Sequence, residues 1–285
     1  MTLQGKLLVE TVGSLALKGN PLGDPRLREV PVYLPPSYME GTSRRYPVVY
    51  FLVGFTGLPK TAVQTHPWRE TIVERFERLI VQGTAPEALL VLPDGFTRYG
   101  GGQYLNSAGT GRYEDHIVEE LVPYVDSRFR TRAAPEGRAV MGKSSGGYAA
   151  LVLAMRHAGV FGHCVCHSGD CLFEIGYGAE FPRCVRALEA YGGDFKAFLD
   201  DFSAARDKFA LPHELLNAAA MSSVYSPNPK SPLGFDLPFD TRTGQTDMKV
   251  FKRWLAQDPL RLAAKHAKDL RALRTLYFDC GVKDE

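Results

Sequence analysis

Short apolar segments rich in β-branched and aromatic residues alternate along this chain with longer segments of helical periodicity. The short segments predict strands at residues 30–34, 47–53, 89–92, 138–141, 164–166 and 275–278. Apolar residues that recur every three or four positions predict helices at residues 68–82, 114–129 and 146–157. This alternation is typical of a mainly parallel sheet with helices on both faces, so we expect an α/β fold.

The alternation fades between residues 181 and 264, where helical pieces and a Pro-rich stretch at 226–234 take over. A chain of 285 residues can form one large α/β domain. We therefore predict a single domain over residues 1–285, with 181–264 as an insertion above the carboxyl edge of the sheet. Such an insertion often forms a lid, and a plain surface excursion is the alternative.

The overall charge and the apolar content limit the classes of partner. The formal charge is +2, from 34 basic and 32 acidic residues that are scattered along the chain, which argues against nucleic acid. No stretch has the length of a membrane span or the form of a signal peptide, so we expect a cytoplasmic protein without a membrane partner. A homo-oligomer is compatible with this composition.

Five cysteines are present, and two of them, Cys164 and Cys166, lie between His163 and His167. Side chains alternate across a strand, so we interpret this segment as a strand with small buried thiols and expect no metal site.

The strongest chemical motif is the pentapeptide at residues 142–146, which places Ser144 between glycines. A predicted strand precedes it and a predicted helix follows it, the context in which a G-x-S-x-G turn exposes a nucleophilic serine above a sheet. Glycines are needed because the turn brings the strand and helix backbones close together. We predict Ser144 as a nucleophile.

The same residues also match a phosphate-binding loop, because 137–144 fit the pattern G-x-x-x-x-G-K-[ST]. In such a loop the strand ends before the first glycine, whereas here residues 138–141 are themselves the predicted strand. Residues 131–136, which would have to form the preceding strand, contain Pro135 and are a poor strand former. We therefore prefer the nucleophile turn.

A nucleophilic serine of this kind needs two backbone N–H donors for the developing oxyanion. Ser145, directly after the nucleophile, supplies the first. The second is predicted at Phe55, because residues 53–57 (VGFTG) follow the strand at 47–53 and their glycines let the Phe55 amide turn toward the reacting carbonyl.

Several segments taken together resemble the esterase D-like, or putative esterase, family of α/β-hydrolases, which includes S-formylglutathione hydrolases, enterochelin esterase-like enzymes and mycolyltransferases. They are the elbow at 142–146 and residues 32–38 (VYLPPSY), 46–57 (YPVVYFLVGFTG) and 119–126 (EELVPYVD). The resemblance implies an α/β-hydrolase fold and a serine esterase that hydrolyses small carboxylic esters through an acyl-enzyme on Ser144, without metal or cofactor.

The resemblance also places the remaining site residues. Residues 276–284 (LYFDCGVKD) look like the acid-bearing loop of the family, with Asp284 as the catalytic acid. Asp279 and Asp170 stay open as alternatives for the acid. Tyr104 and Asn106, in a glycine-rich loop after the strand at 89–92, are expected to contact the substrate.

The catalytic histidine is the departure from the family pattern, because relatives carry it on a loop after one more strand and helix. None of the seven histidines stands at the matching place, and His167 is the one substitute base to consider. We expect the missing strand, helix and histidine loop to follow residue 285. Two alternatives stay open: an acyltransferase with the same residues, and a catalytically inactive esterase-like protein.

Overall fold

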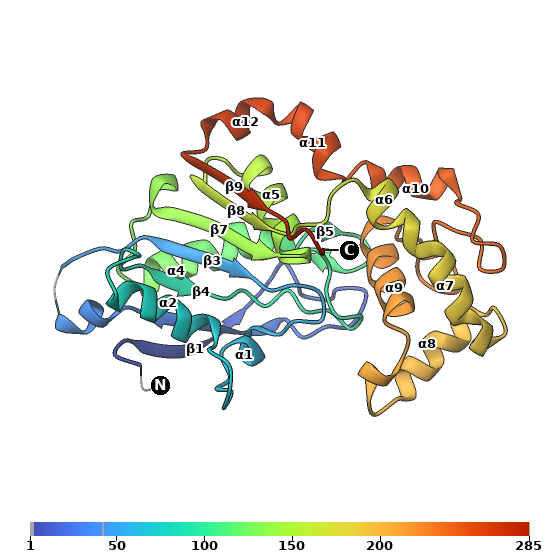
Figure 1. The fold of residues 1–285 in the computed structure, drawn as a ribbon, viewed down its shortest axis with the longest axis horizontal. Coiled ribbons are helices and arrows are strands. Elements are labelled where there is room, and N and C mark those ends of the chain that lie inside the picture. Colours follow the sequence, from blue (N-terminus) through green and yellow to red (C-terminus); the bar gives the residue numbers. More distant parts are fainter. Residues whose placement is uncertain (1–2, 42, 285) are drawn as a thin grey trace.

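The computed structural model describes residues 3–41 and 43–284, so the ends of the predicted domain (1, 2 and 285) lie outside it. A seven-stranded sheet forms its centre, in the order β1-β2-β4-β3-β7-β8-β9 (Figure 1). The strands are β1 (Lys6–Gly13), β2 (Leu27–Leu34), β3 (Val48–Leu52), β4 (Leu89–Val91), β7 (Arg138–Lys143), β8 (His163–His167) and β9 (Thr275–Asp279). A separate two-stranded ribbon consists of β5 (Asn106–Ser107) and β6 (Gly111–Arg112).

Five of the seven strands are parallel, and all six strands predicted from the sequence are present. β3 pairs in parallel with β4 and β7, β7 with β8, and β8 with β9, while β2 is antiparallel to both β1 and β4. The parallel strands therefore end together at one edge, the carboxyl edge, where binding sites of such sheets are built. β1 was not predicted, because the apolar residues of its segment are mixed with polar ones.

Helices cover both faces of the sheet, as expected from the alternation. On one face, α2 (Ile72–Val81) packs its apolar side against β4 and the outward residues of β3. On the other face, α4 (Val122–Arg128) and α5 (Ser145–Arg156) share a core with the alternate residues Val48, Tyr50 and Leu52 of β3. The predicted helix at 114–129 is present as α3 (Tyr113–Asp115), a π-helical segment (His116–Leu121) and α4.

The chain after β8 is mainly helical, and Figure 1 shows most of these helices beyond the carboxyl edge of the sheet. They are α6 (Phe173–Gly176), α7 (Phe181–Leu188), α8 (Phe195–Ala204), α9 (His213–Tyr225) and α10 (Met248–Leu255). The next two, α11 (Pro259–Lys265) and α12 (Ala267–Ala272), return along α5 and lead into β9. One further short helix, α1 (Pro59–Ala62), follows β3.

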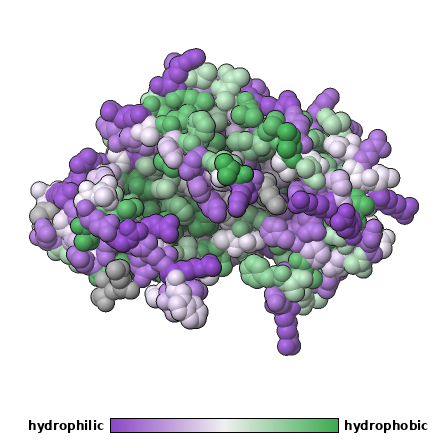
Figure 2. Space-filling model, in the orientation of Figure 1, coloured by the Kyte–Doolittle hydropathy of each residue, from purple (hydrophilic) through white to green (hydrophobic). Residues whose placement is uncertain are grey.

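Strand β9 pairs only with β8 among the strands of the described chain, and its side chains are exposed. Figure 2 shows apolar side chains on this face, and the exposed apolar residues here include Leu276, Phe278 and Val282. Within residues 3–41 and 43–284, no helix has both the length and the apolar character that crossing a membrane requires.

Candidate active site

Ser144 sits in the bend between β7 and α5, with backbone angles φ 54° and ψ −125°. These angles lie in a region that residues with a side chain rarely adopt, so the bend is strained. The Ser144 N–H donates to the carbonyl oxygen of His167 at 3.0 Å, and the Ser144 carbonyl accepts from the Tyr148 N–H at 2.9 Å. Ser144 as a whole is half-buried.

The glycines beside Ser144 are required by close backbone approach. A Cβ on Gly142 would overlap the carbonyl of Gly146, and a Cβ on Gly146 would overlap the carbonyl of Leu52. Because Arg138–Lys143 is a strand in full hydrogen-bonded register with β3 and β8, these residues do not wrap as a phosphate-binding loop. The geometry is that of the strand–turn–helix elbow predicted from the sequence.

The two predicted oxyanion donors lie beside Ser144. A Cβ built on Gly54 would be 3.5 Å from the Cβ of Ser144, which places the Phe55 segment against the elbow. In the described part of the chain, neither the Phe55 nor the Ser145 N–H is paired with a carbonyl. Both residues line one small pocket, together with Val53, Gly54, Gly57, Gly95, Phe96, Gly100, Gly101, Gly102, Gln103 and Tyr104.

Backbone strain is concentrated around this pocket. Six non-glycine residues of the described chain have a positive φ, and each follows the carboxyl end of β3, β4, β7 or β8: Thr56, Gln103, Tyr104, Ser144, Ser168 and Leu172. Strained residues persist only where their surroundings hold them, and they cluster at functional sites. The carboxyl edge is therefore the part of the molecule where an active site is expected.

The predicted acid Asp284 and its alternative Asp279 lie at the same edge, after β9. The Ser168 hydroxyl and the Cys280 thiol hold the pKa of Asp284 below its usual value, helped by the charges of Lys143 and His167. Asp279 is instead engaged by His167, whose Nδ1 lies 2.5 Å from its Oδ1.

The third candidate acid, Asp170, follows β8 and is held by neutral groups. Burial raises the pKa of Asp170, and hydrogen bonds from Gln103 and Tyr177 partly offset this rise. Its Oδ2 accepts from Gln103 Nε2 at 2.9 Å and from the Tyr177 hydroxyl at 2.8 Å. This carboxylate is thus bound into a polar cluster beside the elbow, and the Ser145 hydroxyl also contributes to it.

Among the described residues, no histidine ring is hydrogen-bonded to the Ser144 hydroxyl. Five histidine rings are paired with other side chains: His116 with Glu120, His157 with Glu114, His163 with Thr275, His167 with Asp279, and His266 with Asp269. His213 packs its ring edge-on against Phe55, with 5.4 Å between the ring centres. Nothing in the sequence around His213 indicates this contact.

Of the two residues predicted to contact the substrate, Tyr104 lines the pocket and Asn106 does not. Tyr104 lines the pocket but is buried, and its hydroxyl donates to the Val53 carbonyl at 3.0 Å, so it supports the segment that carries Phe55. Asn106 lies on β5 and is exposed. Its side chain is committed to Asp115, with Nδ2 2.6 Å from Oδ1, so the structure does not bring Asn106 to the pocket.

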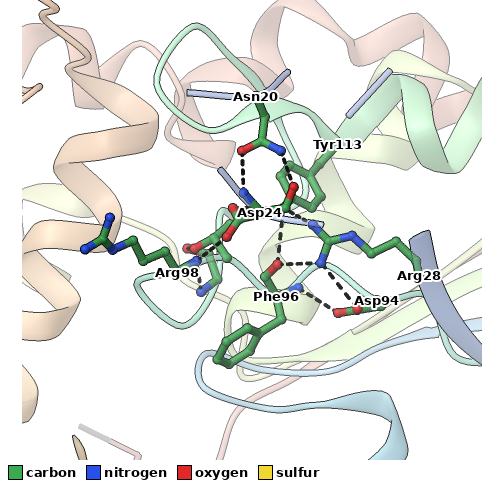
Figure 3. Close-up of polar contacts among 9 residues, drawn as sticks. Asn20, Asp24, Arg28, Asp94, Phe96, Arg98 and Tyr113 are labelled. Atoms are coloured by element: carbon green, nitrogen blue, oxygen red, sulfur yellow. Dashed lines mark hydrogen bonds and ion pairs between the residues drawn. The ribbon is translucent and has the colours of Figure 1, made fainter. Parts of the chain in front are cut away.

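A buried ion network fixes the loop that follows β4 (Figure 3). Arg28, on β2, is 2% exposed and donates to Asp94 at 3.3 Å and to the Phe96 carbonyl at 2.9 Å. It also donates to the Tyr113 hydroxyl at 2.6 Å, and Asp24 accepts from the Arg98 N–H at 2.7 Å. The start of the loop that carries Gly95, Phe96 and Gly100 into the pocket is therefore tied to β2.

Gln103, Tyr177 and the Arg28 network were not identified from the sequence, since each acts through partners distant along the chain. Cys164 and Cys166 are buried on β8, as predicted for that strand.

Known proteins resemble this chain in sequence and in fold. Among curated relatives, an esterase of Mycobacterium tuberculosis (Esterase Rv1288) is 34% identical over 94 residues, which are 32% of this chain and 20% of that protein. An endo-1,4-beta-xylanase/feruloyl esterase of Xylanibacter ruminicola is 27% identical over 141 residues, which are 48% of this chain and 19% of that protein. The chain thus spans about a fifth of the length of these curated relatives.

Solved structures show the same α/β-hydrolase fold. A ferulic acid esterase superposes with a TM-score of 0.57 at 20% identity, over 99% of this chain and 80% of that one. An S-formylglutathione hydrolase of Staphylococcus aureus superposes with a TM-score of 0.52 at 15% identity, over 98% of this chain and 80% of that one. The family model described as Putative esterase matches residues 25–285, which confirms the resemblance found in the sequence motifs. This chain belongs to the Putative esterase family.

Proposed function

We propose that this chain is a serine carboxylic-ester hydrolase that works through an acyl-enzyme on Ser144. The observation that carries the proposal is the elbow: a strained serine between β7 and α5, adjacent to the Phe55 and Ser145 N–H groups, which have no carbonyl partner in the described chain. Preorganised N–H donors of this kind stabilise the oxyanion that forms when a nucleophile attacks a carbonyl.

In the proposed reaction, the Ser144 oxygen attacks the ester carbonyl carbon while its proton passes to a general base. The oxyanion is held by the two amides, and its collapse breaks the bond to the alcohol, which leaves with the proton. Water then attacks the acyl-enzyme, frees the carboxylic acid and returns the proton to Ser144. We assign the acid that orients the base to Asp284, and the Ser168 hydroxyl holds the pKa of this carboxyl below its usual value.

The proposed substrate is a small-molecule ester, in line with the family. The names of relatives with similar folds refer to esters of ferulic acid and to S-formylglutathione, which are acyl compounds. The helices α6–α10 lie beyond the carboxyl edge, and the ring of His213 at the start of α9 contacts Phe55. We propose that this helical segment is a lid that limits access to Ser144.

A fluorophosphonate probe tests the proposal, because it labels a serine only when that serine is activated as a nucleophile. We expect peptide mapping to find the label on Ser144, and we expect Ser144→Ala to abolish it. Ser145→Ala is the matched control: it removes a neighbouring hydroxyl but keeps the oxyanion amide, so labelling should persist. An unlabelled wild-type protein, or a label that survives in Ser144→Ala, would overturn the proposal.

A further inference from the structure

His213, the first residue of α9, is a point at which the helical segment α6–α10 contacts the predicted oxyanion segment. Its ring meets the ring of Phe55 edge-on, with 5.4 Å between the ring centres and 74° between the ring planes. Most residues of the same helix from Leu215 to Tyr225 are buried, so His213 begins a helix that is anchored in the core. His213 itself is exposed and can be substituted without opening that core.

The Phe55 N–H belongs to a tight turn formed by residues 54–57. Across this turn, the Gly57 N–H donates to the Gly54 carbonyl at 2.9 Å. The peptide bonds of the described chain are trans, and the N–H and C=O of a trans peptide point in opposite directions. Because the Gly54 carbonyl points into the turn, the Phe55 N–H of the same peptide points out of it. The shape of the turn therefore decides where this donor is presented.

The turn is strained, so its shape depends on its neighbours. Thr56, its third residue, has φ 61°, in the left-handed region that favours glycine. A residue keeps such an angle only where its surroundings hold it. One contact that holds the turn is the Gly100 carbonyl, which accepts from the Thr56 N–H at 2.8 Å.

The Phe55 side chain is the second contact of the turn with its surroundings, and two elements meet it. A Cβ built on Gly100 would lie 3.2 Å from Cε2 of Phe55, and one built on Gly101 would lie 3.5 Å from its Cδ2. The ring thus rests against the backbone of the loop after β4, and His213 of α9 contacts it as well. Without the His213 ring, only one of these two elements would still hold the Phe55 side chain.

We propose that His213 is a positioning residue for the oxyanion site: its ring holds the Phe55 ring, and with it the turn that presents the Phe55 N–H. This inference rests on the proposed esterase function, and it adds that the helical segment supports the site as well as limiting access to it. A pair of rings in edge-on contact can shift a conformational equilibrium about fivefold. Loss of the contact therefore lowers the fraction of molecules whose Phe55 N–H is in place.

The first test measures kcat and KM for hydrolysis of 4-nitrophenyl acetate. Formation and hydrolysis of the acyl-enzyme both pass through an oxyanion, so His213→Ala should lower kcat about fivefold and leave KM unchanged. His213→Phe keeps an aromatic ring at the contact and should restore kcat. His66→Ala is the matched control, because it removes an exposed histidine whose ring packs edge-on against Trp68, and it should leave kcat unchanged.

A Phe55→Leu background shows whether the effect passes through the ring contact. Leucine keeps the backbone N–H and removes the ring, so His213→Ala should have no further effect on kcat there. An equal loss in both backgrounds, or a rise in KM with unchanged kcat, would overturn the inference. So would a fall of roughly a hundredfold that His213→Phe does not restore, which would instead assign His213 as the general base.

Hydrogen exchange measured by mass spectrometry tests the contact without turnover. The Thr56 and Gly57 amides are hydrogen-bonded, so their exchange reports opening of the turn. His213→Ala should speed exchange across residues 52–58 about fivefold, whereas His213→Phe and His66→Ala should not. Unchanged exchange in His213→Ala would overturn the inference while leaving the esterase function standing. No hydrolysis and no fluorophosphonate labelling of the wild-type protein would instead overturn the function itself, whatever the exchange shows.

Discussion

At the scale of single residues, the site depends on two glycines and one strained serine. Gly142 and Gly146 let β7, α5 and β3 meet at the elbow, where any side chain would overlap a neighbouring carbonyl group. Ser144, between these glycines, has φ 54°. The glycines of the pattern G-x-S-x-G are thus required by steric contact between backbone segments.

Gly146→Ala should therefore be strongly destabilising. The new Cβ would overlap the Leu52 carbonyl, and backbone atoms of β3 and α5 cannot both move without loss of packing. We expect the free energy of unfolding to fall by about 3 kcal/mol in urea denaturation. Gly159→Ala is the control: no heavy atom lies within 4 Å of its added Cβ, so its stability should match wild type. A Gly146→Ala protein as stable as Gly159→Ala would contradict this account of the elbow.

His167 is the substitute base considered from the sequence, and its variant gives a separate test. Its Nδ1 is bound to Asp279 at 2.5 Å, and its ring makes no hydrogen bond to Ser144 among the described residues. We expect His167→Asn to slow fluorophosphonate labelling by less than about tenfold, whereas loss of a general base costs roughly a hundredfold or more. His266→Asn, which also breaks a His–Asp pair but between α11 and α12, is the matched control. A slowing of a hundredfold in His167→Asn alone would assign the base to His167.

At the scale of elements, the pocket depends on the loop after β4, which is anchored to the sheet through β2. Residues 94–98 follow β4 and are joined to β2 through Arg28, while the Arg98 guanidinium donates to Ser203 of α8 at 3.1 Å. Further along the same loop, the Thr56 N–H donates to the Gly100 carbonyl at 2.8 Å, which joins the loop to the Phe55 segment. The loop after β4 thus connects the sheet, helix α8 and the predicted oxyanion site.

Arg28→Met should loosen this loop. It leaves the Phe96 carbonyl and the mostly buried Asp94 carboxylate without their cationic partner, and breaking a buried ion pair in this way costs about 3 kcal/mol or more. Hydrogen exchange measured by mass spectrometry should show faster exchange across residues 94–105 than in wild type. Arg26 is exposed and directly precedes β2. Arg26→Met should therefore change neither the free energy of unfolding nor the rate of hydrogen exchange. Unchanged exchange in Arg28→Met would mean that the loop is held by other contacts.

The sequence predicted those features that are determined by residues close together along the chain. The strands and helices around Ser144 were predictable because their period and their glycines are local features, and the Phe55 segment was predictable because it directly follows a strand. Gln103 was not predictable as a pocket residue, because its partners Asp170 and Tyr177 lie 67 and 74 positions away in the sequence. The π-helical segment and β1 were also missed, since tertiary packing overrides weak local propensity.

At the scale of the whole molecule, helices α6–α10 and the sheet share one apolar core. The buried cluster joins Tyr148 of α5 to Phe173, Tyr177, Tyr225 and Trp254 of these helices, with ring centres 4.7 to 6.3 Å apart. Such continuous packing predicts that the sheet and these helices unfold together, as expected if the chain forms a single domain.

Trp254 offers a direct measurement of this cooperativity. The chain has two tryptophans, of which Trp254 is 1% exposed and Trp68 is 87% exposed. In a Trp68→Phe variant, the tryptophan fluorescence therefore reports the surroundings of Trp254 on α10, while far-UV circular dichroism reports the whole chain. We expect the two urea transitions to coincide within error. A fluorescence transition at lower urea would show that the helices around Trp254 melt as a separate unit.

The strained bend at Ser144 has a consequence for laboratory evolution. A glycine there would adopt φ 54° without penalty, so variants chosen only for surviving heat should accumulate Ser144→Gly early. Such variants would be more stable but would lack the hydroxyl that we propose as the nucleophile. Any thermostability campaign on this protein should therefore score turnover alongside survival.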